Sequence, residues 1–143
     1  MDLQELYDEI VADPFALGYV VGGNWIGDQA IADIMNDNTN GGASDVRRTS
    51  VPMKEIFAEV VWPDFITLSA ERQNCFKLIT STSVLDASSP NIIDAFVAIF
   101  GAGSETLTAL NALTLKVGSR GEVLWGEGTQ VTASQVARAE NLS

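Results

Sequence analysis

The sequence contains no histidine and a single cysteine, Cys75. Without histidine there is no Ser-His-Asp or Cys-His catalytic centre, and no His-ligated zinc or haem. One cysteine excludes an intrachain disulfide and a metal site built from several cysteines. We therefore expect a chain that is not an enzyme and holds neither metal nor cofactor, with Cys75 as a small buried hydrophobic residue on a helix.

Basic residues are also scarce, because eight Lys and Arg stand against 19 Asp and Glu, for a formal net charge of −11. Residues 1–45 hold nine acids and no base. Such a surface repels phosphate backbones and anionic lipid, so we expect no direct nucleic-acid binding and no membrane binding there. Acids spaced like Asp2, Glu5 and Glu9 indicate solvated helix faces. A surface for a basic partner and a mimic of DNA remain open as further interpretations.

Long apolar runs are missing as well. The longest mostly apolar stretch, residues 15–26, is broken by glycine and is too short to cross a bilayer. The N-terminus is acidic and amphipathic, without the basic and apolar regions of a signal peptide. Hydrophobic residues still make up 46% of the chain, and the mean hydropathy is +0.14. This apolar excess favours surface that is buried against neighbouring proteins.

The chain does contain many short segments with helical periodicity. In residues 2–11 the apolar positions follow the i, i+3, i+4, i+7 spacing of one helix face. Caps, prolines and apolar spacing predict further helices at 28–37, from 51–52, after Ser69, at 90–100 and after Ser104, the last including Leu115. The segment 62–64 is expected to end the third helix, and the helix at 90–100 is expected to lie at the centre of the core.

The last thirty residues carry the strongest local signals. Ser119-Arg120-Gly121-Glu122 and Thr132-Ala133-Ser134-Gln135 each fit a capping box, which predicts two short helices. No segment alternates long enough to demand a sheet, although residues 82–85 or 130–132 could pair briefly. The predicted fold is all-α, a compact bundle of about seven short helices in a single helical domain, 1–143. It has an acidic N-terminal third, 1–45, and a C-terminal two-helix tail, 119–143.

Two loops contain parts of ligand-binding motifs. Asn36, Asn38 and Asn40 match positions 1, 3 and 5 of an EF-hand, but position 12 is Arg47 where a bidentate Glu is needed. Gly101-Ala102-Gly103-Ser104 resembles a phosphate loop but lacks the lysine of a Walker A motif. We interpret the first as a polar turn and the second as one helix end followed by a helix start.

The candidate interface residues are arginines and tryptophans. Arg47-Arg48, the one adjacent basic pair, either neutralises Asp45 or the first helix, or docks the acidic face of a neighbouring subunit. The three tryptophans lie at loop or helix-end positions and act either as core or lid residues or as interface anchors. The full set of interface candidates is Trp25, Arg47, Arg48, Trp62, Arg120 and Trp125. No catalytic or metal-binding residue is predicted.

Several short landmarks occur in a fixed order along the chain. Asp13-Pro14 precedes Leu17-Gly18-Tyr19, and these are followed by residues 47–52, 100–104, 119–122 and 131–139. The set resembles a group of small proteins encoded among the virion genes of tailed bacteriophages. Typical relatives have Asp-Pro-Leu-Gly-x-Gly-Tyr and Ser-Arg-Ala-Glu motifs, from which Phe15-Ala16 and Gly121 depart.

The resemblance spans most of the chain and implies a non-enzymatic structural protein of a tailed-phage virion. Such a protein is a repeated subunit of the head–tail connection (neck or collar) or of the tail region. It is made in the host cytoplasm and assembled into the virion, with other virion proteins and copies of itself as partners. Two alternatives stay open, a capsid decoration protein and an acidic DNA-mimic inhibitor of a host DNA-binding protein.

Overall fold

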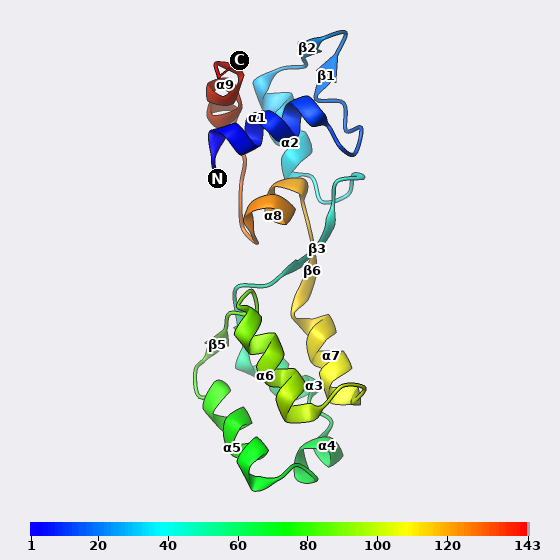
Figure 1. The fold of residues 1–143 in the computed structure, drawn as a ribbon, viewed down its shortest axis with the longest axis vertical. Coiled ribbons are helices and arrows are strands. Elements are labelled where there is room, and N and C mark those ends of the chain that lie inside the picture. The colour runs from blue at the N-terminus through cyan, green and yellow to red at the C-terminus, as the bar shows by residue number, and fades with distance from the viewer. Residues whose placement is uncertain (143) are drawn as a thin grey trace. The chain divides into compact units, whose positions relative to one another are not determined.

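The structure is a computed structural model that describes residues 1–142 (Figure 1). This part of the chain is mostly helical, with nine helices and three small two-stranded sheets. The helical character is therefore confirmed, but the fold is not purely all-α. The chain divides into two compact units. The terminal unit combines Met1–Val46 with residues 117–142, and the central unit is Arg47–Lys116, where the sequence predicted a single domain.

The terminal unit contains four helices and one hairpin. The helices are α1 (Leu3–Ala12), α2 (Asp28–Asn36), α8 (Arg120–Trp125) and α9 (Ala133–Glu140). The hairpin pairs β1 (Val20–Val21) antiparallel with β2 (Asn24–Trp25). Gly22 and Gly23 form its turn with φ of +61° and +83°, the left-handed backbone that a two-residue type I′ turn requires. This hairpin was not among the elements predicted from the sequence.

Helix starts in the terminal unit follow local capping chemistry. The Asp2 carboxylate accepts a hydrogen bond of 2.9 Å from the Gln4 N–H at the start of α1. Both predicted capping boxes, on Ser119 and Thr132, are present. The helix predicted at 28–37 has Asp28 as its first residue, and Gly27 occupies the cap position without a side-chain cap.

The core of the terminal unit is closed by the last helix. α9 packs against both α1 and α2. The buried apolar residues come from both ends of the chain and are Leu6, Ile10, Tyr19, Ile31, Ala32, Met35, Val131, Val136 and Ala139. Since neither end has a core of its own, the first 46 residues and the last segment fold as one body.

The central unit contains five helices. They are α3 (Met53–Glu59), α4 (Trp62–Ile66), α5 (Ala70–Ile79), α6 (Pro90–Phe100) and α7 (Glu105–Leu113). β4 (Val51–Pro52) pairs antiparallel with β5 (Val84–Leu85), inside the predicted segment 82–85. β3 (Ser44–Arg47) and β6 (Leu115–Gly118), the segments through which the chain passes between the units, also form a two-stranded sheet.

The central core is built around α6, as the sequence predicted. Phe96, Ile99 and Phe100 of α6 are buried. Gly101 ends this helix, and the Ser104 hydroxyl accepts the Leu107 N–H at 3.1 Å to start α7. The remaining core residues are Val51, Met53, Ile56, Val60, Phe76, Leu85, Ala87, Leu107 and Leu110. The interpretation of residues 101–104 as a helix junction is therefore confirmed.

Three details of the central unit correct the sequence predictions. Trp62-Pro63 does not end the third helix, because α3 stops at Glu59 and α4 begins at Trp62. Proline is accepted in the first turn of a helix, where its missing N–H has no intrahelical partner. Leu115 lies in β6 and not in the helix after Ser104. Cys75 is on α5 as expected but is exposed.

The Asn-rich loop after α2 is fixed by bonds to the backbone. The Asn36 amide donates to the Val131 carbonyl and accepts from the Val131 N–H, each at 2.8 Å. Asn40 donates to the Ile34 carbonyl at 2.8 Å and accepts from the Gly42 N–H at 3.0 Å. Two of the side chains that matched an EF-hand are thus occupied by a turn and by a link to the start of α9.

We expect Asn36→Ala to lower the free energy of unfolding by about 2–3 kcal/mol, because it removes two hydrogen bonds and leaves the buried Val131 backbone unpaired. Asn38→Ala is the matched control. Its side chain is exposed, so the change is expected to stay within about 0.5 kcal/mol. Urea unfolding followed by circular dichroism measures both. Equal losses in the two variants would contradict the role given to Asn36.

Candidate functional site

A bidentate ion pair is buried in the terminal unit. Nε of Arg120, at the start of α8, donates to Glu9 Oε1 at 2.6 Å, and Nη2 donates to Oε2 at 2.8 Å. The Arg120 and Glu9 side chains are only 12% and 8% exposed. The hydrogen bonds that Arg120 donates to the Glu9 carboxylate raise the pKa of Arg120. A buried charge costs several kcal/mol unless it is paired with good geometry, so each of these residues requires the other.

The loop after α1 wraps around this pair. Asp13 adopts a left-handed φ of +37° at the end of α1. Its carboxylate accepts the N–H groups of Leu17 at 2.6 Å and Gly18 at 2.8 Å. The Phe15 ring centroid lies 4.6 Å from Cζ of Arg120, a cation–π distance. The bonds from Asp13 to Leu17 and Gly18 therefore fix the loop, and the ring of Phe15 covers the Arg120 guanidinium.

Tyr19 is a third buried polar residue near the ion pair of Glu9 and Arg120. Its side chain is fully buried, and its hydroxyl has no hydrogen-bond partner among the described residues. Burial raises the pKa of the Tyr19 phenol above its usual range, and the nearby negative charges of Glu9 and Asp13 add to the rise. The landmarks at 13–19 and 119–122 therefore meet in one place, although about a hundred residues separate them in the sequence.

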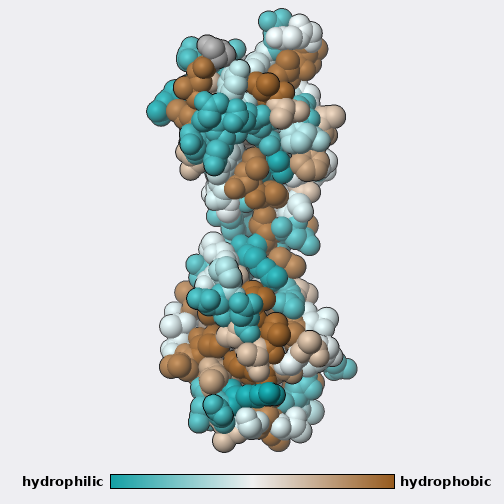
Figure 2. Space-filling model, in the orientation of Figure 1, coloured by the Kyte–Doolittle hydropathy of each residue, from teal (hydrophilic) through white to brown (hydrophobic). Residues whose placement is uncertain are grey.

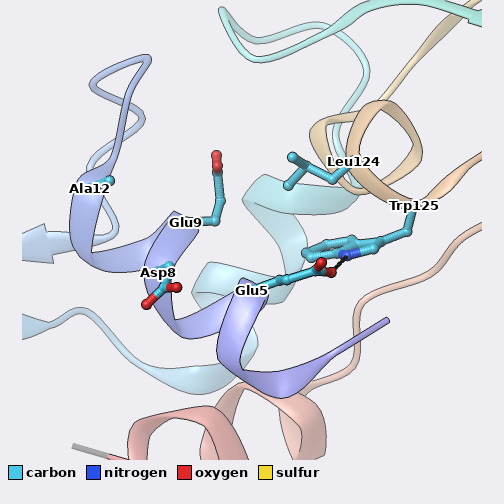
Figure 3. A pocket seen from close by; sticks show the side chains of 6 residues that line it. All are labelled: Glu5, Asp8, Glu9, Ala12, Leu124 and Trp125. Carbon is cyan, nitrogen blue, oxygen red and sulfur yellow. Dashed lines mark hydrogen bonds between the residues drawn. The ribbon is translucent and has the colours of Figure 1, made fainter.

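A surface depression of about 420 Å³ lies beside the pair, between α1 and α8 (Figure 3). Trp125 Nε1 donates to Glu5 Oε2 across it at 2.9 Å. Figure 3 shows the three carboxylates of α1 leaving the helix in different directions. They do not converge on one point, and no group of three or more His, Cys, Asp or Glu among residues 1–142 is placed to hold a metal. The full lining is Glu5, Asp8, Glu9, Ala12, Leu124 and Trp125.

The charge is divided unequally between the units. The terminal unit has twelve acids and two bases, a net charge of −10, whereas the central unit has seven acids and six bases, a net charge of −1. On the face drawn in Figure 2, hydrophilic residues cover much of the unit that holds α1 and α9. Hydrophobic residues gather over the unit that holds α5 and α6. The two units therefore present chemically different surfaces.

The central unit exposes apolar side chains on both sides of α5. A groove of about 270 Å³ between α5 and α6 is lined by Cys75, Leu78, Ile79, Ala95, Ala98 and Ile99. A second groove of about 320 Å³ is lined by Phe57, Trp62, Phe65, Phe76, Lys77 and Thr80. The exposed large apolar residues of the unit are Phe57, Trp62, Ile66, Leu78, Val84 and Val97. The two grooves beside α5, whose linings include the exposed Phe57, Trp62 and Leu78, are the candidate interaction surface.

The three predicted tryptophans have different environments. Trp25 and Trp125 are partly buried and pack against the terminal core. The Trp25 ring lies 6.0 Å from that of Tyr7. Trp62 is exposed on α4, with its ring 5.7 Å from that of Phe65 in an edge-to-face arrangement. Of the three, Trp62 is the one that contributes to the apolar surface of the central unit.

The predicted arginines form contacts inside the chain. Arg47 Nη1 donates to Thr114 Oγ1 at 2.6 Å. Arg48 Nη1 donates to the Leu113 carbonyl at 3.2 Å, and its Nη2 lies 3.0 Å from Glu55 Oε2. Arg48 thus neutralises an acid of the central unit, which neither interpretation of the basic pair named. Arg120 is occupied by Glu9, as described above.

Sequence reasoning missed two parts of these sites. Glu9 was assigned to a solvated face, but it is buried because Arg120 comes to it from the other end of the chain. Cys75 was expected to be buried, but it is exposed, as is Leu78 on the same helix. The available signal was the spacing on α5, because Leu78 follows Phe76 by two positions and therefore lies on the opposite face of the helix.

Comparisons with known proteins give no relative. No protein-family model, no curated protein and no solved structure matches this chain. Within residues 1–142, none of the helices has the length and apolar character needed to cross a membrane.

We expect Arg120→Ala to lower the free energy of unfolding by about 3–5 kcal/mol, because it leaves the Glu9 charge buried and unpaired. Arg138→Ala is the control, since Arg138 is the other base of the terminal unit and is exposed on α9. Its loss removes a favourable charge at a helix C-terminus, at most about 1 kcal/mol. Denaturant unfolding at neutral pH measures both, and similar losses would refute the role of the ion pair.

Tyr19→Phe is expected to leave stability at neutral pH unchanged or slightly raised, because the buried hydroxyl has no partner. The substitution is expected to change stability only at alkaline pH. The unfolded tyrosine ionises near its usual pKa of 10.0 while the folded one resists, so the native chain loses stability as the pH rises above that value. Unfolding free energies from about pH 9 to about pH 11 should fall less steeply in the variant. Identical slopes would contradict the burial of a neutral phenol.

Proposed function

We propose that this chain is a non-enzymatic structural subunit of a tailed-phage virion. It is repeated at the head–tail connection (neck or collar) or in the tail region and works through contacts with other virion proteins and with its own copies. The observation that carries this proposal is the exposed apolar surface around α5 of the central unit. Clustered apolar surface on a folded protein marks an interaction site, whereas singly scattered residues do not.

The roles of the landmark residues support a building block. Asp13 and Ser119 cap backbone segments, and Arg120 neutralises a buried acid. The side chains of these residues are engaged in contacts that hold the terminal unit together. The motifs that carry the resemblance to virion proteins are thus structural in this chain, which fits a subunit that is assembled and not one that turns over a substrate.

The charge of the terminal unit is also suited to a virion. A surface with a net charge of −10 repels phosphate, so DNA passing near it would not adhere. The same surface attracts basic patches on neighbouring proteins over about 8–10 Å at physiological salt. The strongly acidic terminal unit and the apolar grooves of the nearly neutral central unit provide two kinds of contact for one subunit.

Mass spectrometry of purified particles of the encoding phage tests the proposal. We expect the chain in the particles, at a copy number fixed relative to the major virion proteins and small enough for a ring. A copy number close to that of the capsid protein would instead identify a decoration protein. Absence from washed particles, with the chain abundant in infected cells, would contradict a virion role of either kind.

A DNA-mimic inhibitor is the second candidate, and the net charge of −10 on the terminal unit is the observation that favours it. Its signature is binding to a host DNA-binding protein that weakens steeply with added salt and is displaced by duplex DNA. Affinity purification from infected cells at two salt concentrations separates this candidate from the virion subunit, because a mimic is captured with the host protein and is missing from particles.

A further inference from the structure

The loop between α2 and β3 contains a chemically labile dipeptide, Asn40-Gly41. Asparagine is a thermolabile residue, because the backbone nitrogen of the next residue can attack its side-chain amide. A following glycine has no Cβ to hinder that attack. Asn40 is the only asparagine in the sequence that precedes glycine, so it is the position at which this reaction is least hindered.

Hydrogen bonds hold both the side chain and the main chain of Asn40. Its Nδ2 donates to the Ile34 carbonyl at 2.8 Å, and its Oδ1 accepts the Gly42 N–H at 3.0 Å. Its backbone carbonyl accepts the Ala43 N–H at 3.1 Å. Asn40 is partly buried, whereas Asn38 in the same loop is exposed. The labile residue is therefore fixed by a turn, and its neighbour Asn38 provides an exposed reference.

The same turn packs closely against residues around the buried ion pair. Gly42 is buried, and a Cβ at this position would lie 2.8 Å from Leu17 Cδ1 and 3.2 Å from Arg120 Cβ. At Gly41 a Cβ would meet nothing closer than Leu17 Cδ2 at 3.9 Å, an ordinary van der Waals contact. A change of backbone at Asn40 therefore reaches Leu17 and Arg120, whereas a methyl group on Gly41 fits the fold.

We infer that Asn40 is a site of spontaneous deamidation that the folded turn suppresses, and that the product weakens the terminal unit. In this reaction the Gly41 backbone nitrogen gives up its proton to hydroxide and bonds to Asn40 Cγ. The Cγ–Nδ2 bond breaks, and Nδ2 takes a proton from water and leaves as ammonia. Water then opens the cyclic imide to aspartate or isoaspartate. The net reaction takes up water and releases ammonia, with no oxidation or reduction, and it is independent of the proposed function.

The fold opposes the reaction because the leaving group is a hydrogen-bond donor of the turn. The bond from Asn40 Nδ2 to the Ile34 carbonyl must break before ammonia leaves, which requires local opening of the loop. The carboxylate of an aspartate product has no N–H to donate and places a negative charge beside the same carbonyl. Isoaspartate adds a carbon to the main chain, which disrupts the bond from the Ala43 N–H to Asn40. Because the reaction is irreversible, openings of the loop accumulate chains with a less stable terminal unit.

Peptide mapping by mass spectrometry of the full-length chain tests the site. Samples are incubated at mildly alkaline pH in buffer and in enough urea to unfold the chain. In urea, Asn40 should deamidate faster than Asn38, which precedes threonine. In buffer, the rate at Asn40 should be at least about tenfold lower than in urea, with the exposed Asn38 as the reference for the effect of urea itself. Equal rates at Asn40 in both samples, or a rate in urea no higher than at Asn38, would overturn the inference.

Gly41→Ala tests the route of the reaction. The added methyl group hinders attack on Asn40 Cγ, and Gly41 does not have the left-handed φ that would strain an alanine. The variant should therefore unfold at no lower urea concentration than the wild type, yet deamidate more slowly at Asn40 in urea. A variant that deamidates at the wild-type rate would show that the Gly41 nitrogen is not the attacking group, and the inferred reaction would then be wrong.

The consequence for the terminal unit has its own test, because Asn40→Asp reproduces one product of the reaction. Urea unfolding should give this variant an equilibrium constant for unfolding at least about tenfold larger than that of the wild type. Asn38→Asp is the matched control, since it adds the same charge to the same loop at an exposed position and should change the constant far less. Similar constants for the two variants would contradict the inferred loss of stability.

Discussion

The buried pair of Glu9 and Arg120 is the constraint on which the terminal unit depends. Their charges are separated by 111 positions in the sequence, and neither is tolerable in the core without the other. The pair forms only when α1 and α8 are docked, and docking also brings α9 onto α1 and α2. The loop from Asp13 to Tyr19 can then close over the guanidinium. One electrostatic requirement thus ties both ends of the chain into one body and leaves the residues between them to fold as a second unit.

The two units divide the surface chemistry of the chain. Nearly all of the net charge lies on the terminal unit, which keeps that unit hydrated and repels copies of it. The central unit is almost neutral and exposes large apolar side chains. Because the repulsion falls on the terminal unit, contact between copies is electrostatically least opposed at the central unit.

Features encoded within a few neighbouring residues could be predicted from the sequence. The capping boxes on Ser119 and Thr132 and the helix junction at Gly101–Ser104 depend on contacts within one helical turn, and all are present. The burial of Glu9 and the division into two units could not be predicted, because both depend on which distant segment covers a helix. Apolar periodicity shows that a face is covered, but it does not identify the covering segment. The hairpin of β1 and β2 was missed because strands of two residues have no periodicity to detect.

The position of the exposed apolar surface could not be predicted from the sequence either. The excess of hydrophobic residues indicated that apolar surface would meet a neighbour, but it could not say where. On α5, Phe76 is buried in the core and Ile79 packs against it, whereas Cys75 and Leu78 are exposed, so the expected burial of Cys75 was wrong. A unit of five short helices packs only one side of α5, and the other side is left uncovered. A helix that is apolar on both sides within so small a unit therefore points to a second protein surface.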